Sequence, residues 1–103
     1  MVRMVEDKRG ELERLCRQYY VKVLEVFGSA MREDYEGEPA DIDFLVEFEE
    51  SVGSRRFDNF FAFQAALSGL FGMPVDLVEP GGMKNPYFIK RVNQTRSVVY
   101  GAS

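Results

Sequence analysis

Three aspartates and a Gly-Ser pair form a pattern whose chemistry would be the binding of a metal ion and of phosphate. The acids are Asp41, Asp43 and Asp76, and the pair is Gly28 and Ser29. Carboxylate oxygens are hard ligands, and Mg²⁺ typically shares them with waters and substrate phosphates. The chain contains no histidine, so it lacks the commonest general base and the commonest zinc ligand. The pattern therefore indicates a metal-dependent nucleotide site.

The first two acids, Asp41 and Asp43, open an apolar run that is typical of a β-strand. Because successive strand side chains alternate between the two faces, both acids would lie on one face, about 6–7 Å apart along the strand. Like charges this close repel unless a cation compensates them. Taken alone, such a pair could also mark the solvated end of a strand, and so could Asp76. The occurrence of all three acids on neighbouring strands, after a Gly-Ser turn, favours a metal site over solvated strand ends.

The Gly-Ser pair follows Phe27 at the end of another predicted strand. Gly28 allows the backbone to adopt unusual φ values and to approach a ligand closely. Ser29 is a predicted N-cap, and the N-terminus of the helix after it would offer free N–H groups to phosphate oxygens. Arg32 lies one turn further, where it could either face a phosphate or be solvated. The alternative for the pair is an ordinary strand-to-helix connection.

The elements that must position these residues alternate along the chain. Helices are predicted over 6–19, 30–34, 55–71 and 85–92, and strands over 21–27, 41–49, 75–79 and 97–100. The helices follow from apolar residues at helical spacing, and the last one from Asn85 and Pro86 as N-cap and first residue. Strands this short and close do not suit a doubly wound sheet. The sequence predicts an α+β fold, with a small mixed β-sheet and helices packed on one side.

Composition and charge narrow the function classes. The chain has 103 residues and a net charge of −4, with 13 basic and 17 acidic residues. A single domain over residues 1–103 is predicted from this length. The acidic balance argues against strong nucleic-acid binding, which needs basic residues to neutralise phosphates. No apolar run could span a membrane, and no secretory signal is recognisable. The single Cys16 suits a reducing compartment, so the predicted location is the cytoplasm.

The order and spacing of these motifs resemble the nucleotidyltransferase superfamily that includes DNA polymerase beta. Within it, the chain is most similar to the minimal nucleotidyltransferases (MNT). Members carry a strand ending in Gly-Ser, a short helix with an arginine, Asp-x-Asp on the next strand and a third Asp on a later strand. The matching residues are Gly28, Ser29, Asp41, Asp43 and Asp76. The resemblance extends from about residue 21 to residue 100 and implies the palm-like nucleotidyltransferase fold.

The resemblance also implies an activity and a role for each residue. Asp41, Asp43 and Asp76 would be the catalytic and metal-binding acids. They would hold two Mg²⁺ ions on a nucleoside triphosphate, with ATP as substrate. Gly28, Ser29 and Arg32 would bind the nucleotide, and an acceptor hydroxyl would attack the α-phosphate. MNT proteins usually pair with a HEPN-type partner protein, as antitoxin to toxin, and can adenylylate that partner. A homodimer is left open.

Three departures from the family pattern leave a second hypothesis open. Glu33 follows Arg32 where many relatives have Gly, Ala40 precedes the first acid where many have Ser, and Met31 replaces a small residue. The alternative function is therefore a catalytically inactive binding module that neutralises a partner by contact. A small-molecule nucleotidyltransferase is a third hypothesis, but the chain has no room for an acceptor domain. The three intact acids favour the enzyme.

Two surface features remain outside the motif. Phe61 lies beside the apolar stripe of the helix predicted over 55–71, where it would either pack in the core, which we expect, or form an exposed partner surface. Basic residues also gather near the C-terminus: Lys84, Lys90, Arg91 and Arg96. They could face nucleotide phosphates or an acidic partner, but a solvated helix face is the expectation.

Overall fold

A computed structural model of the protein describes residues 3–28, 42–82 and 85–101. In chain order its elements are α1 (Arg3–Asp7), α2 (Arg9–Gln18), β1 (Val21–Phe27), β2 (Ile42–Phe48), η2 (Glu50–Arg55), α3 (Arg56–Phe71), β3 (Val75–Val78), η3 (Pro80–Gly82), α4 (Pro86–Thr95) and β4 (Ser97–Gly101). The helix predicted over residues 30–34 lies outside the described residues. The other predicted helices and strands are present, with ends shifted by a few residues. The short 3₁₀ helix η2 fills the connection between the strand predicted over 41–49 and the helix predicted over 55–71.

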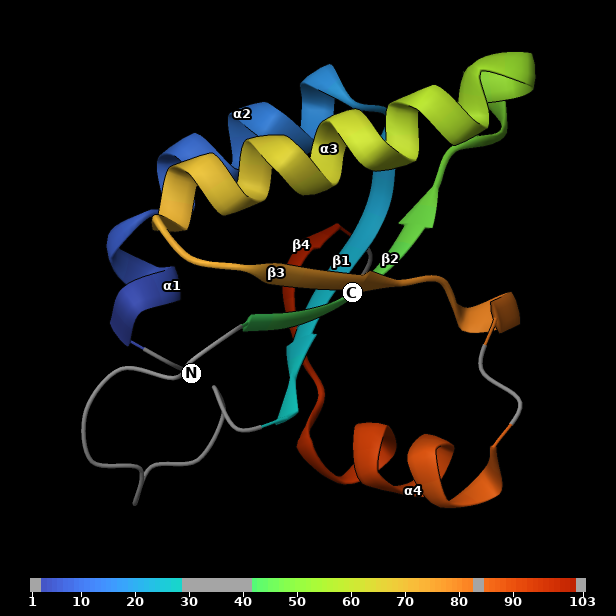
Figure 1. Ribbon diagram of the computed structural model, residues 1–103. Coiled ribbons are helices and arrows are strands. Elements are labelled where there is room, and N and C mark those ends of the chain that lie inside the picture. Colours follow the sequence, from blue (N-terminus) through green and yellow to red (C-terminus); the bar gives the residue numbers. More distant parts are fainter. Residues whose placement is uncertain (1–2, 29–41, 83–84, 102–103) are drawn as a thin grey trace.

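The four strands form one mixed sheet, as predicted, and their order in it is β3-β2-β1-β4 (Figure 1). β1 pairs antiparallel with both β2 and β4, whereas β2 and β3 run parallel. Parallel neighbours need a crossover connection, and α3 supplies it between β2 and β3. This crossover is what brings the start of β3 beside the start of β2.

The main hydrophobic core lies between the sheet and the helices α1, α2 and α3. Its strand residues alternate with residues of the opposite face, as Ile42, Phe44 and Val46 do along β2. The helices contribute buried side chains at helical spacing, among them Leu12 and Cys16 of α2. Figure 1 shows α2 and α3 lying side by side above the sheet. The expected helical layer on one side of the sheet is therefore present.

Helix α4 lies on the other face of the sheet (Figure 1). A second cluster joins Val92 of α4 to Phe27 and Leu45, which alternate with the core-facing residues of β1 and β2. The helix begins as the sequence predicts, because the Tyr87 backbone N–H donates to Asn85 Oδ1 over 2.9 Å. The sheet thus has helices on both faces: the expected layer of α1, α2 and α3 on one, and α4, which was not expected there, on the other.

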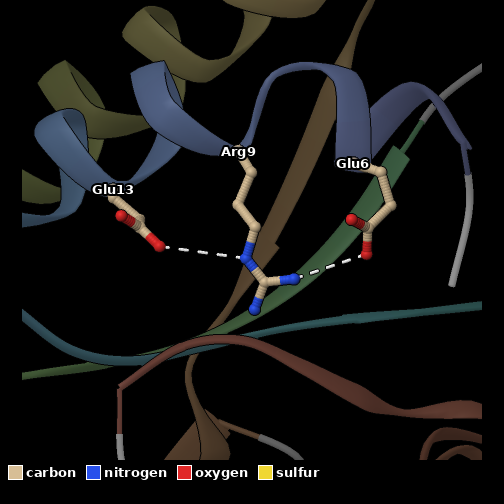
Figure 2. Close-up of polar contacts among 3 residues, drawn as sticks. All are labelled: Glu6, Arg9 and Glu13. Carbon is tan, nitrogen blue, oxygen red and sulfur yellow. Dashed lines mark hydrogen bonds and ion pairs between the residues drawn. The ribbon is translucent and has the colours of Figure 1, made fainter.

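One helix was predicted over residues 6–19, but the structure has two helices, α1 and α2, at this end of the chain. Arg9 connects them. The helical hydrogen bonding changes at Lys8, which separates α1 from α2. Figure 2 shows Arg9 between two carboxylates, with Nη1 3.3 Å from Glu6 Oε1 and Nε 3.8 Å from Glu13 Oε1. All three side chains are between 43% and 45% exposed, so these ion pairs stabilise the junction only weakly.

Three polar side chains of α3 fix the helix against its neighbours. Asn59 Nδ2 donates to the Tyr19 carbonyl over 2.7 Å, at the entry to β1. Gln64 Nε2 donates to the Val75 carbonyl over 2.9 Å, at the start of β3. Ser68 Oγ donates to the Met73 carbonyl, just after the helix has ended at Gly72 in the left-handed conformation. These bonds set the position of β3 relative to the helix.

The aromatic residues at the start of α3 are not all in the core. Phe63 is fully buried, but Phe57 is 78% exposed and Phe61 is 56% exposed. The expectation that Phe61 packs in the core is therefore wrong. Figure 1 shows the first turns of α3 reaching past the end of α2, which leaves this part of the helix without a neighbouring helix.

Candidate active site

Two of the three predicted acids lie directly opposite each other in the sheet. In the parallel register of β2 and β3, Asp43 pairs with Asp76. Each acid alternates with core-facing neighbours, so both side chains point to the face that α4 covers. Adjacent strands are about 4.8 Å apart, which puts the two carboxylates within reach of one cation. Asp43 is half-buried and Asp76 is exposed.

The apolar residues on either side hold both acids in place. Ile42 and Phe44 flank Asp43, and Val75 and Leu77 flank Asp76; all four are buried in the main core. The Ile42 backbone N–H also donates to the Pro74 carbonyl over 3.1 Å, which extends the pairing of the two strands to their first residues. A slip by one residue would turn these side chains to the wrong face. The register of the acids is therefore set by the core.

Gly28 meets the carboxylate of Asp43. The residue before it, Phe27, pairs with Asp43 across β1 and β2. Gly28 has a φ of +79°, and a Cβ atom built on it would lie 2.6 Å from Asp43 Oδ2. A side chain at this position would be strained and would collide with the acid. The glycine thus lets the turn backbone and the carboxylate approach each other closely.

The remaining predicted site residues lie outside the described residues. These are Asp41, Ser29 and Arg32. Within residues 3–28, 42–82 and 85–101, no group of three Asp, Glu, Cys or His side chains could hold a metal ion. Two of the three predicted metal ligands, Asp43 and Asp76, are brought together on the sheet, and the third belongs to the segment before β2.

A charged cluster on the same face was not predicted from the sequence. Arg96, between α4 and β4, has its Nε 2.6 Å from Oε2 of Glu25, and its Nη2 donates to Oε1 over 3.2 Å. Nη1 of the same guanidinium donates to Asn93 Oδ1 over 2.9 Å. Glu25 is only 7% exposed, although it is a carboxylate in the middle of β1. Its charge between the apolar Leu24 and Val26 was the available signal, but its partner is 71 residues away.

The basic residues near the C-terminus were expected to form a solvated helix face, and this expectation can be compared with the structure for Lys90 and Arg96. Lys90 is exposed, as a solvated helix face requires. Arg96 instead pairs with Glu25 and so fastens the end of α4 to the sheet. Lys84 and the side chain of Arg91 lie outside the described part of the structure.

Similarity to solved structures identifies the fold class. A structure described as a putative minimal nucleotidyltransferase superposes with a TM-score of 0.70 and 28% identity, covering 94% of this chain and 95% of that one. A complex from Shewanella oneidensis, described as a tri-AMPylated HEPN toxin with an MNT antitoxin, gives a TM-score of 0.63 and 16% identity over 94% of this chain and 72% of the other. The protein therefore has the fold of the minimal nucleotidyltransferases.

Sequence comparison identifies the family. The nucleotidyltransferase domain family matches residues 9–99. Two Methanocaldococcus jannaschii proteins are also similar. "Putative protein adenylyltransferase MJ0128" is 41% identical over 80 residues, which is 78% of each chain. "Putative protein adenylyltransferase MJ1217" is 32% identical over 89 residues, covering 86% of this chain and 87% of its own. The protein belongs to the nucleotidyltransferase domain family, whose members are transferases, and the resemblance predicted from its motifs is confirmed.

A separate finding concerns the membrane. Among the described residues, no helix is both long and apolar enough to cross a bilayer.

Proposed function

We propose that this protein is an Mg²⁺-dependent nucleotidyltransferase that transfers AMP from ATP to a hydroxyl group of a partner protein. The observation that carries the proposal is the in-register pair of Asp43 and Asp76 beside Gly28, in a chain of this family. Carboxylates on adjacent strands, next to a glycine turn that leaves room for a ligand, are suited to a cation bound between protein and phosphate oxygens.

The residues present fit a divalent metal. Their donors are carboxylate oxygens, and Gly28 keeps the space beside Asp43 Oδ2 free of a side chain. Asp41, Asp43 and Asp76 would hold two Mg²⁺ ions. When bound, such a pair neutralises the phosphates and stabilises the attacking and leaving oxygens of an in-line displacement.

The residues of the chain would bind the nucleotide and move one proton. Gly28 and Ser29 would offer backbone N–H groups to the phosphates, with Arg32 adding positive charge. The exposed carboxylate of Asp76 would accept the proton of the acceptor hydroxyl. A bond would then form between that oxygen and the α-phosphorus, and the bond to the β-phosphate would break, so that pyrophosphate leaves.

The acceptor and the donor are inferred from the relatives. The two M. jannaschii proteins are named as protein adenylyltransferases. The solved structures of this fold include the MNT antitoxin bound to an AMPylated HEPN toxin, and a toxin-antitoxin complex with AMP-PNP. We therefore propose a HEPN-type toxin as partner and ATP as donor. A cytoplasmic location is consistent with a single buried thiol, Cys16.

The test is calorimetry of ATP binding in the presence of Mg²⁺. We expect wild type to bind ATP, and Asp43→Asn and Asp76→Asn each to lose at least tenfold in affinity, which is about 1.4 kcal/mol. Asp58→Asn, an exposed carboxylate in the first turn of α3, is the matched control and should bind like wild type. Equal binding by all four proteins would place the nucleotide elsewhere and reject the site.

Transfer is tested separately with ATP labelled at the α-phosphate and a purified HEPN-type partner. Label on the partner that disappears with Asp43→Asn supports adenylylation. A partner that is neutralised equally well by wild type and by Asp43→Asn, without label, would instead support the second candidate, a binding module that acts by contact. The departures Glu33 and Ala40 from the family pattern are what favour that alternative.

A further inference from the structure

The first two turns of α3 expose an aromatic cluster made of Phe57, Phe60 and Phe61. The ring centroids of Phe57 and Phe61 are 5.9 Å apart, and those of Phe60 and Phe61 are 5.3 Å apart. Phe60 also contacts Phe48 of β2, with centroids 6.3 Å apart, which attaches the cluster to the core. Exposed rings in mutual contact are a recurrent mark of protein interaction sites.

The rings form one side of a small notch. Its volume is about 290 Å³, and it is lined by Arg56, Glu79 and the three rings. Arg56 Nη2 donates to Glu79 Oε1 over 3.1 Å, so an ion pair joins α3 to the residue after β3 in the lining of the notch. The notch is the size of an apolar side chain or two, and most of its surface is aromatic.

A larger, acidic groove adjoins the notch. It has a volume of about 450 Å³ and shares Arg56 and Glu79 with the notch. The end of β2 and the start of η2 supply three more carboxylates to its lining: Glu47, Glu49 and Glu50. Four carboxylates therefore line the groove against one guanidinium, and that guanidinium is already paired with Glu79. The groove carries a negative potential that would attract cations.

We propose that the notch and the groove together form a docking surface for a protein segment that carries an apolar side chain next to lysines or arginines. The apolar side chain would fill the aromatic notch, and the basic side chains would face Glu47, Glu49 and Glu50. Charge complementarity of this kind selects the partner and speeds its association. Nucleic acid is disfavoured because its phosphates would meet the carboxylates.

A second copy of the chain is a poorer occupant. A two-fold dimer through this surface would place the same patch on both subunits, so the acidic groove of one would face that of the other. Like charges brought together across an interface are unfavourable. The observations thus favour a different protein with basic residues.

The docking surface lies away from the acids of the active site. Asp43 is near the start of β2, whereas the lining of the groove begins at Val46, three residues or about 10 Å further along the strand, and continues beyond the end of β2. A partner held there would leave Asp43 and Asp76 accessible. The inference therefore goes beyond the proposed transfer reaction and stands whether or not ATP binds.

The test uses a short fluorescent peptide in which Leu and Phe alternate with Lys. Two counterparts replace every Lys by Glu, or the Leu and Phe by Ser. We expect the first peptide to bind wild type and to shift the amide NMR signals of residues 47–61 and 79, and both counterparts to bind at least tenfold more weakly. Affinity should fall as salt is raised.

Matched variants separate the two halves of the surface. Phe57→Ala/Phe61→Ala should lower the affinity at least tenfold, because a few buried anchor side chains carry most of the binding energy of an interface. Tyr87→Ala removes an 80% exposed aromatic ring from α4 and should change nothing. Glu47→Gln/Glu49→Gln/Glu50→Gln should weaken binding and flatten its salt dependence, whereas Glu6→Gln/Glu11→Gln/Glu13→Gln on α1 and α2 should not.

Each contrary result rejects the proposal. Equal affinity for the acidic peptide, or amide shifts that fall on α4 rather than on residues 47–61, would show that the surface has no such preference. A wild type that is dimeric by ultracentrifugation, with monomeric Phe57→Ala/Phe61→Ala, would show that a second copy occupies it. ATP binding measured on the same variants should stay unchanged, so failure here is distinguishable from failure of the nucleotide site.

Discussion

At the scale of single residues, Gly28 determines whether the acid next to it can face a ligand. A side chain here would need φ of +79° and would overlap Asp43 Oδ2. Asp43 would then have to turn away from its place opposite Asp76. The close approach of the Gly28 backbone to the Asp43 carboxylate thus leaves no room for a side chain at position 28.

Gly28→Ala is expected to destabilise the protein by about 1–3 kcal/mol, because of the backbone strain and the displaced carboxylate. The affinity for ATP should fall together with the stability. Calorimetry measures the affinity, and urea unfolding measures the stability. Gly10→Ala is the control: Gly10 lies in α2 with no atom within 4 Å of an added Cβ. That variant should be neutral or more stable by up to about 1 kcal/mol. A Gly28→Ala protein with the stability and the ATP affinity of wild type would contradict the role given to Gly28.

Cys16 gives a pH dependence that can be measured. Desolvation raises the pKa of this buried thiol from an ordinary value of 9.0 to about 12; Glu13 adds to the rise and Arg17 opposes it. The folded chain holds the proton more tightly than the unfolded chain. The contribution to stability is therefore complete below pH 9 and is lost as the pH rises through 12.

The free energy of unfolding of wild type should fall faster than that of Cys16→Ala between pH 9 and pH 12. The difference in slope is expected to reach at most about 1.4 kcal/mol per pH unit. Both proteins share the same Tyr and Lys residues, so the comparison isolates the thiol. Parallel slopes in urea unfolding would mean that the thiol is solvated.

At the scale of elements, the ion pair of Arg96 with Glu25 connects α4 to β1. The sheet face that carries the acids is covered by α4, whose apolar contacts are few: Val92 meets Phe27, Leu45 and Val78. The guanidinium adds three contacts at the C-terminal end of the same helix. Removing it would leave a buried carboxylate without its cation.

Arg96→Met is expected to cost about 2–4 kcal/mol, somewhat below the usual cost of breaking a fully buried pair because the Arg96 side chain is 41% exposed. Arg9→Met, which removes the exposed pairs with Glu6 and Glu13 seen in Figure 2, should cost less than about 1 kcal/mol. Urea unfolding of both variants measures the difference. Glu25→Met/Arg96→Met should recover much of the loss; if it does not, the pair is not the cause.

At the scale of the whole molecule, one core joins the two ends of the chain. Val5 of α1 and Val99 of β4 belong to the same buried cluster, which also contains residues from every strand and from α2 and α3. Elements that share one core lose their contacts together when any of them leaves. We therefore expect the elements that share this core to unfold together, whereas a single domain over residues 1–103 stays a prediction from length.

Thermal unfolding should accordingly be one cooperative transition, with equal calorimetric and van't Hoff enthalpies. Circular dichroism of the helices and fluorescence of the tyrosines should give the same midpoint. Two separated transitions, for instance an early loss of α4 alone, would show that the helix on the acid-bearing face is an independent unit.

Local signals made much of the fold predictable. The four strands follow from short β-branched and aromatic runs, and the start of α4 follows from Asn85 and Pro86, because propensities and caps depend on neighbours in sequence. The acids and Gly28 were recognisable for the same reason, since their motif depends on residue type and spacing. The break between α1 and α2 at Lys8 was not, because lysine is a good helix former and the nearest glycine, Gly10, lies inside α2.

The sequence by itself thus determined the four strands, most of the described helices, the family and the candidate chemistry. Only the tertiary structure decided that Asp43 lies opposite Asp76, that α4 covers their face, that Arg96 pairs with Glu25 and that Phe57 and Phe61 are exposed. Each of these depends on contacts between residues far apart in the chain. Such contacts are selected by how the faces of the sheet and helices are buried, which no local pattern specifies.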